Sequence, residues 1–233
     1  MSRPEHFGRL DVSRLRTRSE AVVIERVVDE PLVVLGSSQP DELIVEDAAI
    51  DVVRRRGGGG AVFVDPVQTI WIDLWLPATS SLVHDVRGLL IGVGGQLRSV
   101  LASRGVGGLR VVETTTSAEQ SVACFAGLGF GELVEAQGRK LLGLTAWRSR
   151  DGALVQSAVY RTRDRRLPAF LSLSDAERAA LGGVLEDQVS DLSSVAPRLG
   201  DDPLAGHLIA EDLAALLGAE LERRGPERER ERP

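Results

Sequence analysis

Residues 69–77 read TIWIDLWLP, and this stretch decides how the chain around it is interpreted. Four aliphatic residues at the even positions 70 to 76 alternate with Trp71, Asp73 and Trp75. Successive side chains of a β-strand point to opposite faces of the sheet, so one face of this stretch should be entirely apolar. The pattern therefore predicts a β-strand.

The chain that follows this strand changes its period. Between Ser81 and Arg104, apolar residues recur at steps of three and four, which is the spacing of an amphipathic helix packed on a sheet. Gly92, Gly94 and Gly95 lie inside this predicted helix, and each costs about 1 kcal/mol relative to alanine. We therefore expect a kink or a close packing contact there.

Shorter periodic runs lie on both sides of this strand and helix. The runs at 21–28 and 31–37 look like neighbouring strands and their turn, and a third run at 49–56 leads into four glycines. After the helix come a strand at 109–116 and a predicted antiparallel meander at 132–136, 140–148 and 153–161. Ser174 and Glu177 have the spacing of a capping box that opens a helix, and a last helix is expected near 207–221.

This order of elements predicts an α+β fold with a mixed, mostly antiparallel sheet flanked by helices. A chain of 233 residues, 43% of them apolar, can bury the core of one catalytic domain, which we place at residues 1–222. Residues 223–233 alternate charges and end on proline, so they are expected to form a disordered, charged tail.

The composition of the chain limits the cellular compartments and the classes of partner that we expect. The net charge of −6 argues against a nucleic-acid partner, although Arg54, Arg55 and Arg56 form a local basic cluster. Cys124 is the one cysteine, which rules out an intramolecular disulfide and favours a reducing compartment. No run approaches the roughly 18 apolar residues of a membrane span. The sequence therefore predicts a cytoplasmic protein without a membrane partner.

Residues 54–65 read RRRGGGGAVFVD, which resembles a phosphate loop only superficially. A Walker loop has a lysine and a hydroxyl residue after its glycines and then begins a helix, whereas an apolar strand follows here. The tract is either a flexible hairpin with its arginines in solvent, or a place where a ligand lies directly on the backbone. Backbone N–H groups beside guanidinium groups can hold a phosphate or a carboxylate, so the candidate ligand is an anion.

Lys140 lies in EAQGRKLLGLTAWR (135–148) and is the only lysine of the chain. Nucleotide bias could leave one lysine by chance, and an exposed hairpin lysine would need no catalytic role. A compact ammonium, however, acts as a point charge in a way that a planar guanidinium cannot copy. We therefore treat Lys140 as a candidate catalytic cation.

The glycine tract followed by GRKLLG (138–143) resembles the biotin/lipoate protein ligase family, in its lipoate branch, over roughly residues 30 to 165. The first motif of that family is matched by Arg55, Arg56, Gly57, Gly58, Gly59, Gly60, Ala61, Val62, Phe63 and Asp65. The second motif is matched by Gly138, Arg139, Lys140, Leu141, Leu142 and Gly143. The resemblance implies a catalytic domain like those of class II synthetases and biotin ligases.

The resemblance also implies an activity. Such an enzyme binds lipoate or octanoate and ATP with Mg²⁺ as substrates and forms an acyl adenylate. It then transfers the acyl group to a lysine of a lipoyl-carrier domain. Lys140 would be catalytic, and the matched residues of the first motif would bind substrate together with Gln68, Gly143 and Thr145. The resemblance implies no resident metal site.

Two alternatives remain open at this stage. Some members of the family are octanoyltransferases that carry the acyl group as a thioester on a cysteine in the same context as Cys124, with an acyl carrier protein as donor; a free cysteine can equally be a small buried apolar residue. Val64 and Ser157 stand where the family commonly has histidines, and Gln68 stands where it often has asparagine. These departures leave room for a non-catalytic member that binds an acyl adenylate or a carrier domain.

Overall fold

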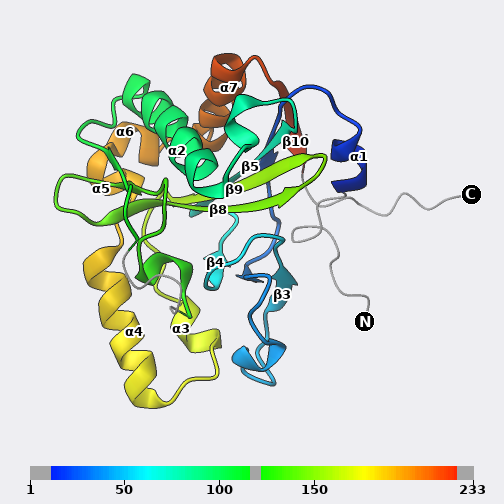
Figure 1. Cartoon of the computed structure of the whole chain (residues 1–233). Helices are drawn as coiled ribbons and strands as arrows, with labels where there is room; N and C mark the ends of the chain where they lie inside the picture. Colours follow the sequence, from blue (N-terminus) through cyan, green and yellow to red (C-terminus); the bar gives the residue numbers. More distant parts are fainter. Residues whose placement is uncertain (1–11, 116–121, 225–233) are drawn as a thin grey trace, which may run out of the picture.

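Two β-sheets form the centre of the protein, as seen in a computed structural model that describes residues 12–115 and 122–224 (Figure 1). The larger sheet has the strand order β10 (Glu220–Arg224), β1 (Val22–Arg26), β5 (Thr69–Pro77), β9 (Gly152–Tyr160), β8 (Lys140–Ser149), β7 (Leu133–Val134) and β6 (Arg110–Val111). The smaller sheet has the order β3 (Asp51–Arg54), β2 (Leu32–Leu35) and β4 (Val62–Val64). Pairing is antiparallel except between β1 and β10 and between β2 and β3.

Helices flank the larger sheet and form further layers of the fold. The α-helices are α1 (Val12–Arg16), α2 (Val86–Ser103), α3 (Leu167–Phe170), α4 (Asp175–Gln188), α5 (Leu192–Val195), α6 (Pro197–Gly200) and α7 (Ala205–Leu217). The short 3₁₀ turns are η1 (Asp41–Leu43), η2 (Ser81–Val83) and η4 (Cys124–Ala126). Helices α2 and α7 cover one face of the larger sheet, while the smaller sheet, α3 and α4 lie on the other side (Figure 1). The predicted α+β class with a mixed, mostly antiparallel sheet is confirmed.

The central strand β5 is buried on both faces. Its aliphatic residues at 70, 72, 74 and 76 pack into one core beneath α2 and α7, as their alternation predicts. On the other face, Trp71 packs into a second core that the smaller sheet completes. Asp73 on that same face is fully buried and pairs with Arg26 at 2.7 Å. The second face is therefore also closed, which positions β9 and β8 against the smaller sheet.

Strand partners differ from the sequence prediction at two places. The runs at 21–28 and 31–37 are not neighbours, because β1 pairs with β5 and β10, whereas β2 pairs with β3 and β4. The glycine tract also does not close a hairpin, since β3 and β4 flank β2 on opposite sides. Both β1 and β2 are buried along their whole length, so their apolar residues alone could not identify which strand supplies the hydrogen bonds.

Other predicted elements occur with altered ends. The meander β7–β8–β9 is antiparallel, and Ser174 caps α4 with the predicted reciprocal bonds to Glu177. Of the run at 109–116, the structure describes residues 109–115, and these contribute only the two-residue strand β6. Helix α7 ends at Gly218, which adopts the left-handed conformation at φ 60°, and β10 follows. Strand β10 includes Arg223 and Arg224, which were assigned to the tail; residues 225–233 lie outside the described part of the chain.

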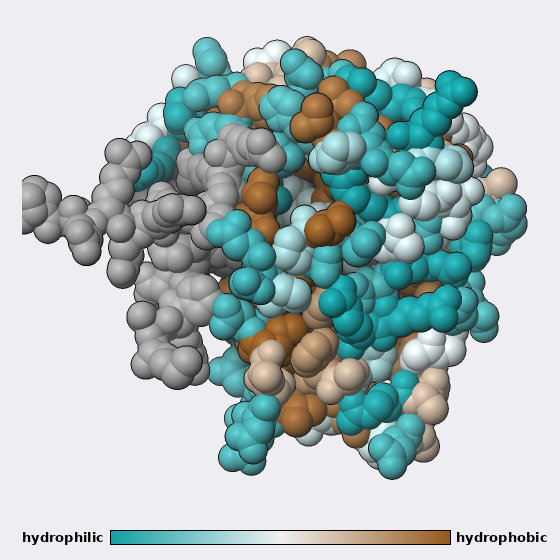
Figure 2. Space-filling model, turned by 180° about the vertical axis from the view of Figure 1, so that it is seen from behind, coloured by the Kyte–Doolittle hydropathy of each residue, from teal (hydrophilic) through white to brown (hydrophobic). Residues whose placement is uncertain are grey.

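Hydrophilic residues cover most of the coloured surface seen from behind, with apolar residues in small groups between them (Figure 2). The large hydrophobic residues that are exposed lie in separate elements and loops: Val45, Val67, Val86, Leu204 and Leu216. Within residues 12–115 and 122–224, no helix has both the length and the apolar character that a membrane crossing requires.

Close packing of backbone occurs where the sequence led us to expect it. A Cβ atom at Gly94 in α2 would overlap the carbonyl oxygen of Gly131. Gly131 itself has a φ of 77°, and a Cβ there would overlap the carbonyl of Leu90. A Cβ at the adjacent Gly95 would meet no atom within 4 Å. Only one of these two neighbouring helix glycines is therefore required by packing.

We predict opposite effects for alanine at these two positions. Gly94→Ala should lower the free energy of unfolding by about 1–3 kcal/mol because helix α2 must move away from the Gly131 loop. Gly95→Ala should raise it by up to about 1 kcal/mol through helix propensity alone. Urea denaturation of both variants measures the difference, and equal effects would show that α2 does not contact the loop in this way.

Candidate active site

Lys140 is the first residue of β8, and its side chain is buried rather than exposed on a hairpin. The residue is 1% exposed, and its Nζ lies 2.7 Å from Glu132 Oε1. Nζ also donates hydrogen bonds to the carbonyl oxygens of Cys124 at 2.6 Å and Gly127 at 3.0 Å. An ammonium has three donors, and each has an oxygen partner here. The alternative of a solvent-exposed lysine is therefore wrong.

Glu132 is the partner that sequence reasoning missed. Its Oε1 also accepts from the backbone N–H of Leu144 at 3.2 Å, and Oε2 accepts from the N–H of Gly129 at 2.7 Å. Glu132 immediately precedes β7, which pairs with β8. The hairpin pairing of the two runs could have placed this acid beside the lysine strand, because cross-strand neighbours in a hairpin follow from its register.

Two aromatic rings and one glycine shape the space around the lysine chain. Nζ lies 5.1 Å from the centroid of Phe125, which in turn contacts Tyr160 with ring centroids 4.7 Å apart. A Cβ at Gly143 would lie 3.3 Å from Cε of Lys140 and 3.5 Å from the Phe125 ring. Because Gly143 has no side chain, the side chains of Lys140 and Phe125 can both pack against this part of β8.

Arg55 lies inside the glycine tract instead of projecting into solvent. It is 2% exposed, and its Nη2 donates to the carbonyls of Gly58 at 2.6 Å and Gly60 at 2.9 Å. Burial lowers the pKa of Arg55, and the side chains of Cys124 and Glu132 oppose that shift. No carboxylate forms an ion pair with Arg55 among the described residues, and its buried Nε has no hydrogen-bond partner there. The guanidinium therefore organises the loop, and Arg56 next to it is the exposed arginine.

The glycine tract contacts both the lysine strand and the cysteine turn. Thr145 Oγ1 donates to the carbonyl of Gly58 at 3.1 Å, and a Cβ at Gly57 would overlap that threonine side chain. Ala61 donates its N–H to the carbonyl of Val122 at 2.8 Å, and the N–H of Cys124 donates to the carbonyl of Ala61 at 2.9 Å. Three segments distant in sequence are thus joined by direct contacts.

A small cavity of about 10 Å³ lies where these segments meet, with room for roughly one water molecule. Its lining residues are Arg55, Val62, Trp71, Cys124, Gly143, Leu144, Thr145, Gln156 and Ala158. The cavity therefore brings together five of the residues that the sequence singled out. It also adds Trp71 and Gln156, which no motif indicated.

Asp73 orients the polar side of this cavity. It accepts from Trp71 Nε1 at 2.8 Å and from Gln156 Nε2 at 3.1 Å, in addition to its ion pair with Arg26. With its amide nitrogen held by Asp73, Gln156 leaves Oε1 buried and without a partner. A buried carboxylate with several donors is thus used to fix residues that line the cavity.

Phe63 and Asp65, at the end of the first motif, do not line this cavity. Phe63 is buried and stacks on Phe170 at 5.5 Å. Asp65 caps the following turn, accepting from the N–H groups of residues 67 and 68 at 2.8 and 2.9 Å, and pairs with Arg166 at 2.6 Å. Burial opposes ionisation of Asp65, but these hydrogen bonds outweigh it and lower its pKa. Val64 and Ser157 are also buried, and Ser157 donates to the carbonyl of Ile72 at 2.9 Å.

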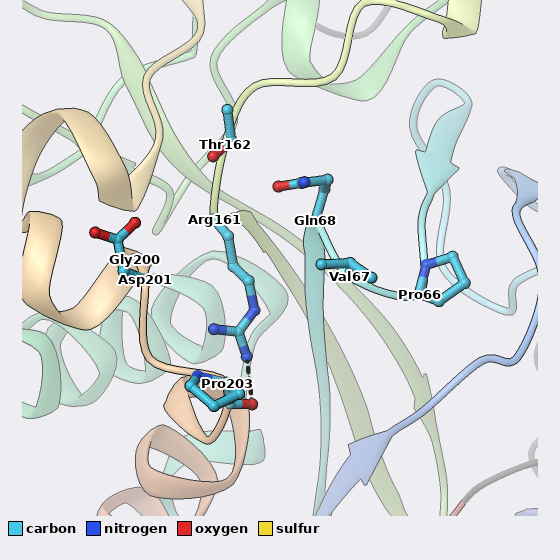
Figure 3. A pocket seen from close by; sticks show the side chains of 8 residues that line it. All are labelled: Pro66, Val67, Gln68, Arg161, Thr162, Gly200, Asp201 and Pro203. Atoms are coloured by element: carbon cyan, nitrogen blue, oxygen red, sulfur yellow. Dashed lines mark hydrogen bonds between the residues drawn. The ribbon is translucent and has the colours of Figure 1, made fainter.

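Gln68 lines a different and larger pocket of about 440 Å³, near α6 and the start of α7 (Figure 3). The other lining residues are Pro66, Val67, Arg161, Thr162, Gly200, Asp201 and Pro203. The Arg161 guanidinium donates to the carbonyls of Asp202 and Pro203. The structure therefore does not bring Gln68 to the cavity beside Lys140. Across residues 12–115 and 122–224, no group of three or more histidine, cysteine or acidic residues could hold a metal ion.

We predict unequal consequences for lysine at the two adjacent arginines. Arg55→Lys should lower the free energy of unfolding by about 2–4 kcal/mol, because one ammonium cannot occupy the positions of both Nη2, which binds the Gly58 and Gly60 carbonyls, and Nη1, which binds that of Val34. Arg56→Lys should change it by less than about 0.5 kcal/mol, because the side chain is exposed and keeps its charge over the ring of Trp147. Chemical denaturation of both variants tests this, and a neutral Arg55→Lys would contradict the structural role.

No family model matches the sequence, and no curated protein matches it. Solved structures of similar fold do exist. One is described as a bi-partite lipoate protein ligase and its E2 lipoyl domain from Thermoplasma acidophilum, and it matches with a TM-score of 0.70 at 14% identity over 92% of this chain and 79% of that chain. A putative lipoate protein ligase from the same organism with bound lipoic acid gives 0.65 at 14% identity over 92% and 81%.

A third structure, of a lipoate-protein ligase A bound with ATP, gives a TM-score of 0.60 at 16% identity over 84% of this chain and 72% of that chain. At sequence identities of 14–16%, such matches establish the fold alone. The three matches cover between 84% and 92% of this chain. The chain therefore has the fold of the lipoate-protein ligases, as the ordered pair of sequence motifs implied.

Proposed function

We propose that the protein is a lipoate-protein-ligase-like enzyme that activates lipoate or octanoate with ATP and transfers the acyl group to a lysine of a carrier domain. The single observation that carries this proposal is the burial of the one lysine of the chain against the Cys124 turn, which in turn hydrogen-bonds to Ala61 directly after the four glycines. A solved structure of similar fold contains lipoic acid, and another contains ATP. A lipoyl domain accompanies a third.

Excess positive charge in the buried site favours an anionic ligand. Arg55 and Lys140 each contribute one positive charge, whereas Glu132 is the one carboxylate among residues 12–115 and 122–224 that acts on both. An uncompensated buried charge is costly, so a carboxylate or phosphate would be stabilised here. The substrates of the proposed reaction bring such groups, namely the acid itself and the phosphates of ATP with its Mg²⁺.

The proposed reaction has two steps. A carboxylate oxygen of the acid attacks the α-phosphorus of ATP and pyrophosphate leaves, which forms the acyl adenylate. The amine of the carrier lysine then attacks the acyl carbon, and AMP leaves. Lys140 would stabilise the negative charge that develops on the carbonyl oxygen and on the α-phosphate.

The glycine tract and its neighbours would hold the nucleotide and the acid. Gly58 has open space where a Cβ would lie, and the exposed guanidinium of Arg56 is available to a phosphate. The cavity lined by Gly143 and Thr145 is too small for an acyl chain, so the surrounding segments must separate when the acid binds. Ala61 follows the four glycines and bonds to the Cys124 turn, and Val62 begins β4; both would complete this side of the binding site.

A second candidate reaction rests on the position of Cys124. Cys124 lines the same cavity as Arg55 and Gly143. In octanoyl transfer, the thiolate attacks the acyl carbon of a thioester on an acyl carrier protein, and the carrier thiol leaves. The acceptor lysine then displaces the Cys124 thiol. This route needs no ATP.

Isotope exchange between ATP and pyrophosphate tests the ligase reaction. We expect exchange that depends on octanoate or lipoate, and a loss of at least about 100-fold in Lys140→Gln because one charge-stabilising donor is removed. Cys124→Ala should retain exchange. Arg150→Gln is the matched control on the β8–β9 hairpin, since its side chain is 92% exposed and far along the hairpin from the lysine.

Intact-protein mass spectrometry after incubation with octanoyl-carrier protein tests the transfer reaction. A covalent acyl adduct that disappears in Cys124→Ala would favour the thioester route over the ligase route. Absence of both exchange and adduct, with adenylate binding retained, would refute catalysis and leave a binding protein. Thermal unfolding of each variant checks that a lost signal does not reflect a lost fold.

A further inference from the structure

The three oxygen partners of the Lys140 ammonium are of two kinds. Glu132 supplies a carboxylate oxygen at 2.7 Å, whereas Cys124 and Gly127 supply neutral backbone carbonyls. Hydrogen bonds to an ionised acceptor are roughly twice as strong as those to a neutral one. Because all three donors are occupied, a ligand oxygen can reach the ammonium only by replacing one of these partners.

Glu132 is anchored independently of the lysine. The residue is 3% exposed, and the backbone N–H groups of Gly129 and Leu144 donate to its two carboxylate oxygens. Gly129 lies in the loop before β7 and Leu144 lies within β8, so the carboxylate is tied to that loop and to β8. It would therefore keep its place if the ammonium changed its other partners.

The carbonyl partners belong to a segment outside the β7–β8 hairpin. Cys124 begins the three-residue turn η4. Gly127 is the C-cap of the same turn and has extended backbone. The turn is attached to the glycine tract through the paired Ala61 and Ala123. A shift of this turn would uncover the ammonium without disturbing the β7–β8 hairpin.

We propose that Glu132 is a positioning residue that fixes the position of the Lys140 ammonium relative to the β7–β8 hairpin. In this arrangement, the carbonyls of Cys124 and Gly127 are resting partners that an anionic ligand oxygen replaces. The identity of that ligand rests on the proposed function, whereas the positioning role of Glu132 does not. Ligand binding would then be coupled to movement of the turn that carries Cys124.

Other ionisable groups around the lysine belong to four further segments. The Cys124 thiol lies on η4, Arg55 follows β3, and the Tyr160 hydroxyl lies at the end of β9, where burial raises its pKa. Asp191 follows Ser190, whose N–H donates to the carbonyl of Lys140 at 2.8 Å, and the Asp191 carboxylate pairs with Arg163 at 3.1 Å. Glu132 is thus the one carboxylate in contact with Nζ among the described residues.

The single lysine of the chain makes this role directly measurable. Trace acetylation of the full-length protein with acetic anhydride, read by peptide mass spectrometry, reports Lys140 separately from the N-terminal amine at each pH. A neighbouring carboxylate favours the charged, unreactive form of an amine. In Glu132→Gln, Lys140 should therefore be labelled about tenfold faster than in the wild type at the same pH, because the ionised acceptor of its hydrogen bond is removed.

Glu135→Gln is the matched control. Glu135 is equally buried and lies on the same hairpin, but it pairs with Arg139 and does not contact Lys140. Its labelling profile should coincide with that of the wild type. If Glu132→Gln does not fold, Glu132→Asp withdraws the carboxylate by one methylene and should shift the profile in the same direction by a smaller amount, whereas Glu135→Asp should not.

A profile for the folded Glu132 variants that coincides with the wild type would overturn the proposal. Failure of the proposed function would give a different result. In that case, octanoate and ATP would leave the acetylation of Lys140 in the wild type unchanged, while Lys140 in Glu132→Gln would still be acetylated faster than in the wild type.

Discussion

The buried ion pair between Lys140 and Glu132 is the interaction on which the arrangement of the site depends. Removing two charges from water costs several kcal/mol per ion, and their attraction offsets this only when the remaining donors and acceptors are also satisfied. Here the ammonium meets three oxygens, and the carboxylate meets two backbone N–H groups besides the lysine. In the structure, the ammonium of this pair also joins the Cys124 turn to the β7–β8 hairpin, and the turn hydrogen-bonds to Ala61 directly after the four glycines.

The glycine tract is likewise organised by a buried cation bonded to backbone carbonyls, here a guanidinium in place of the ammonium. Arg55 is folded beneath the loop and binds the carbonyls of Gly58 and Gly60, so the loop is shaped from within. Glycines are needed at this place for close approach, since a Cβ at Gly57 would overlap Thr145 and one at Gly36 would overlap the carbonyl of Gly59. Two buried cations with one shared carboxylate neighbour make the region attractive to an anion.

The sequence contained enough information for the fold class and for the assembly of part of the site. Alternation in 69–77 and the helical period after it depend on local burial, and both appear in the structure. The assignment of β1 and β2 to different sheets depends on hydrogen bonding between distant strands, which residue patterns do not encode. For the same reason, motif matching grouped Gln68 with the glycine tract although it faces another pocket. Glu132 was missed because its role follows from hairpin register and not from its residue type.

A crystal structure with a non-hydrolysable acyl-adenylate analogue tests the central claim most directly. The account predicts that Nζ of Lys140 stays paired with Glu132 and exchanges the carbonyls of Cys124 and Gly127 for the acyl oxygen and the phosphate mimic of the analogue. An analogue bound in the pocket of Gln68, with the ammonium still on both carbonyls, would contradict the account.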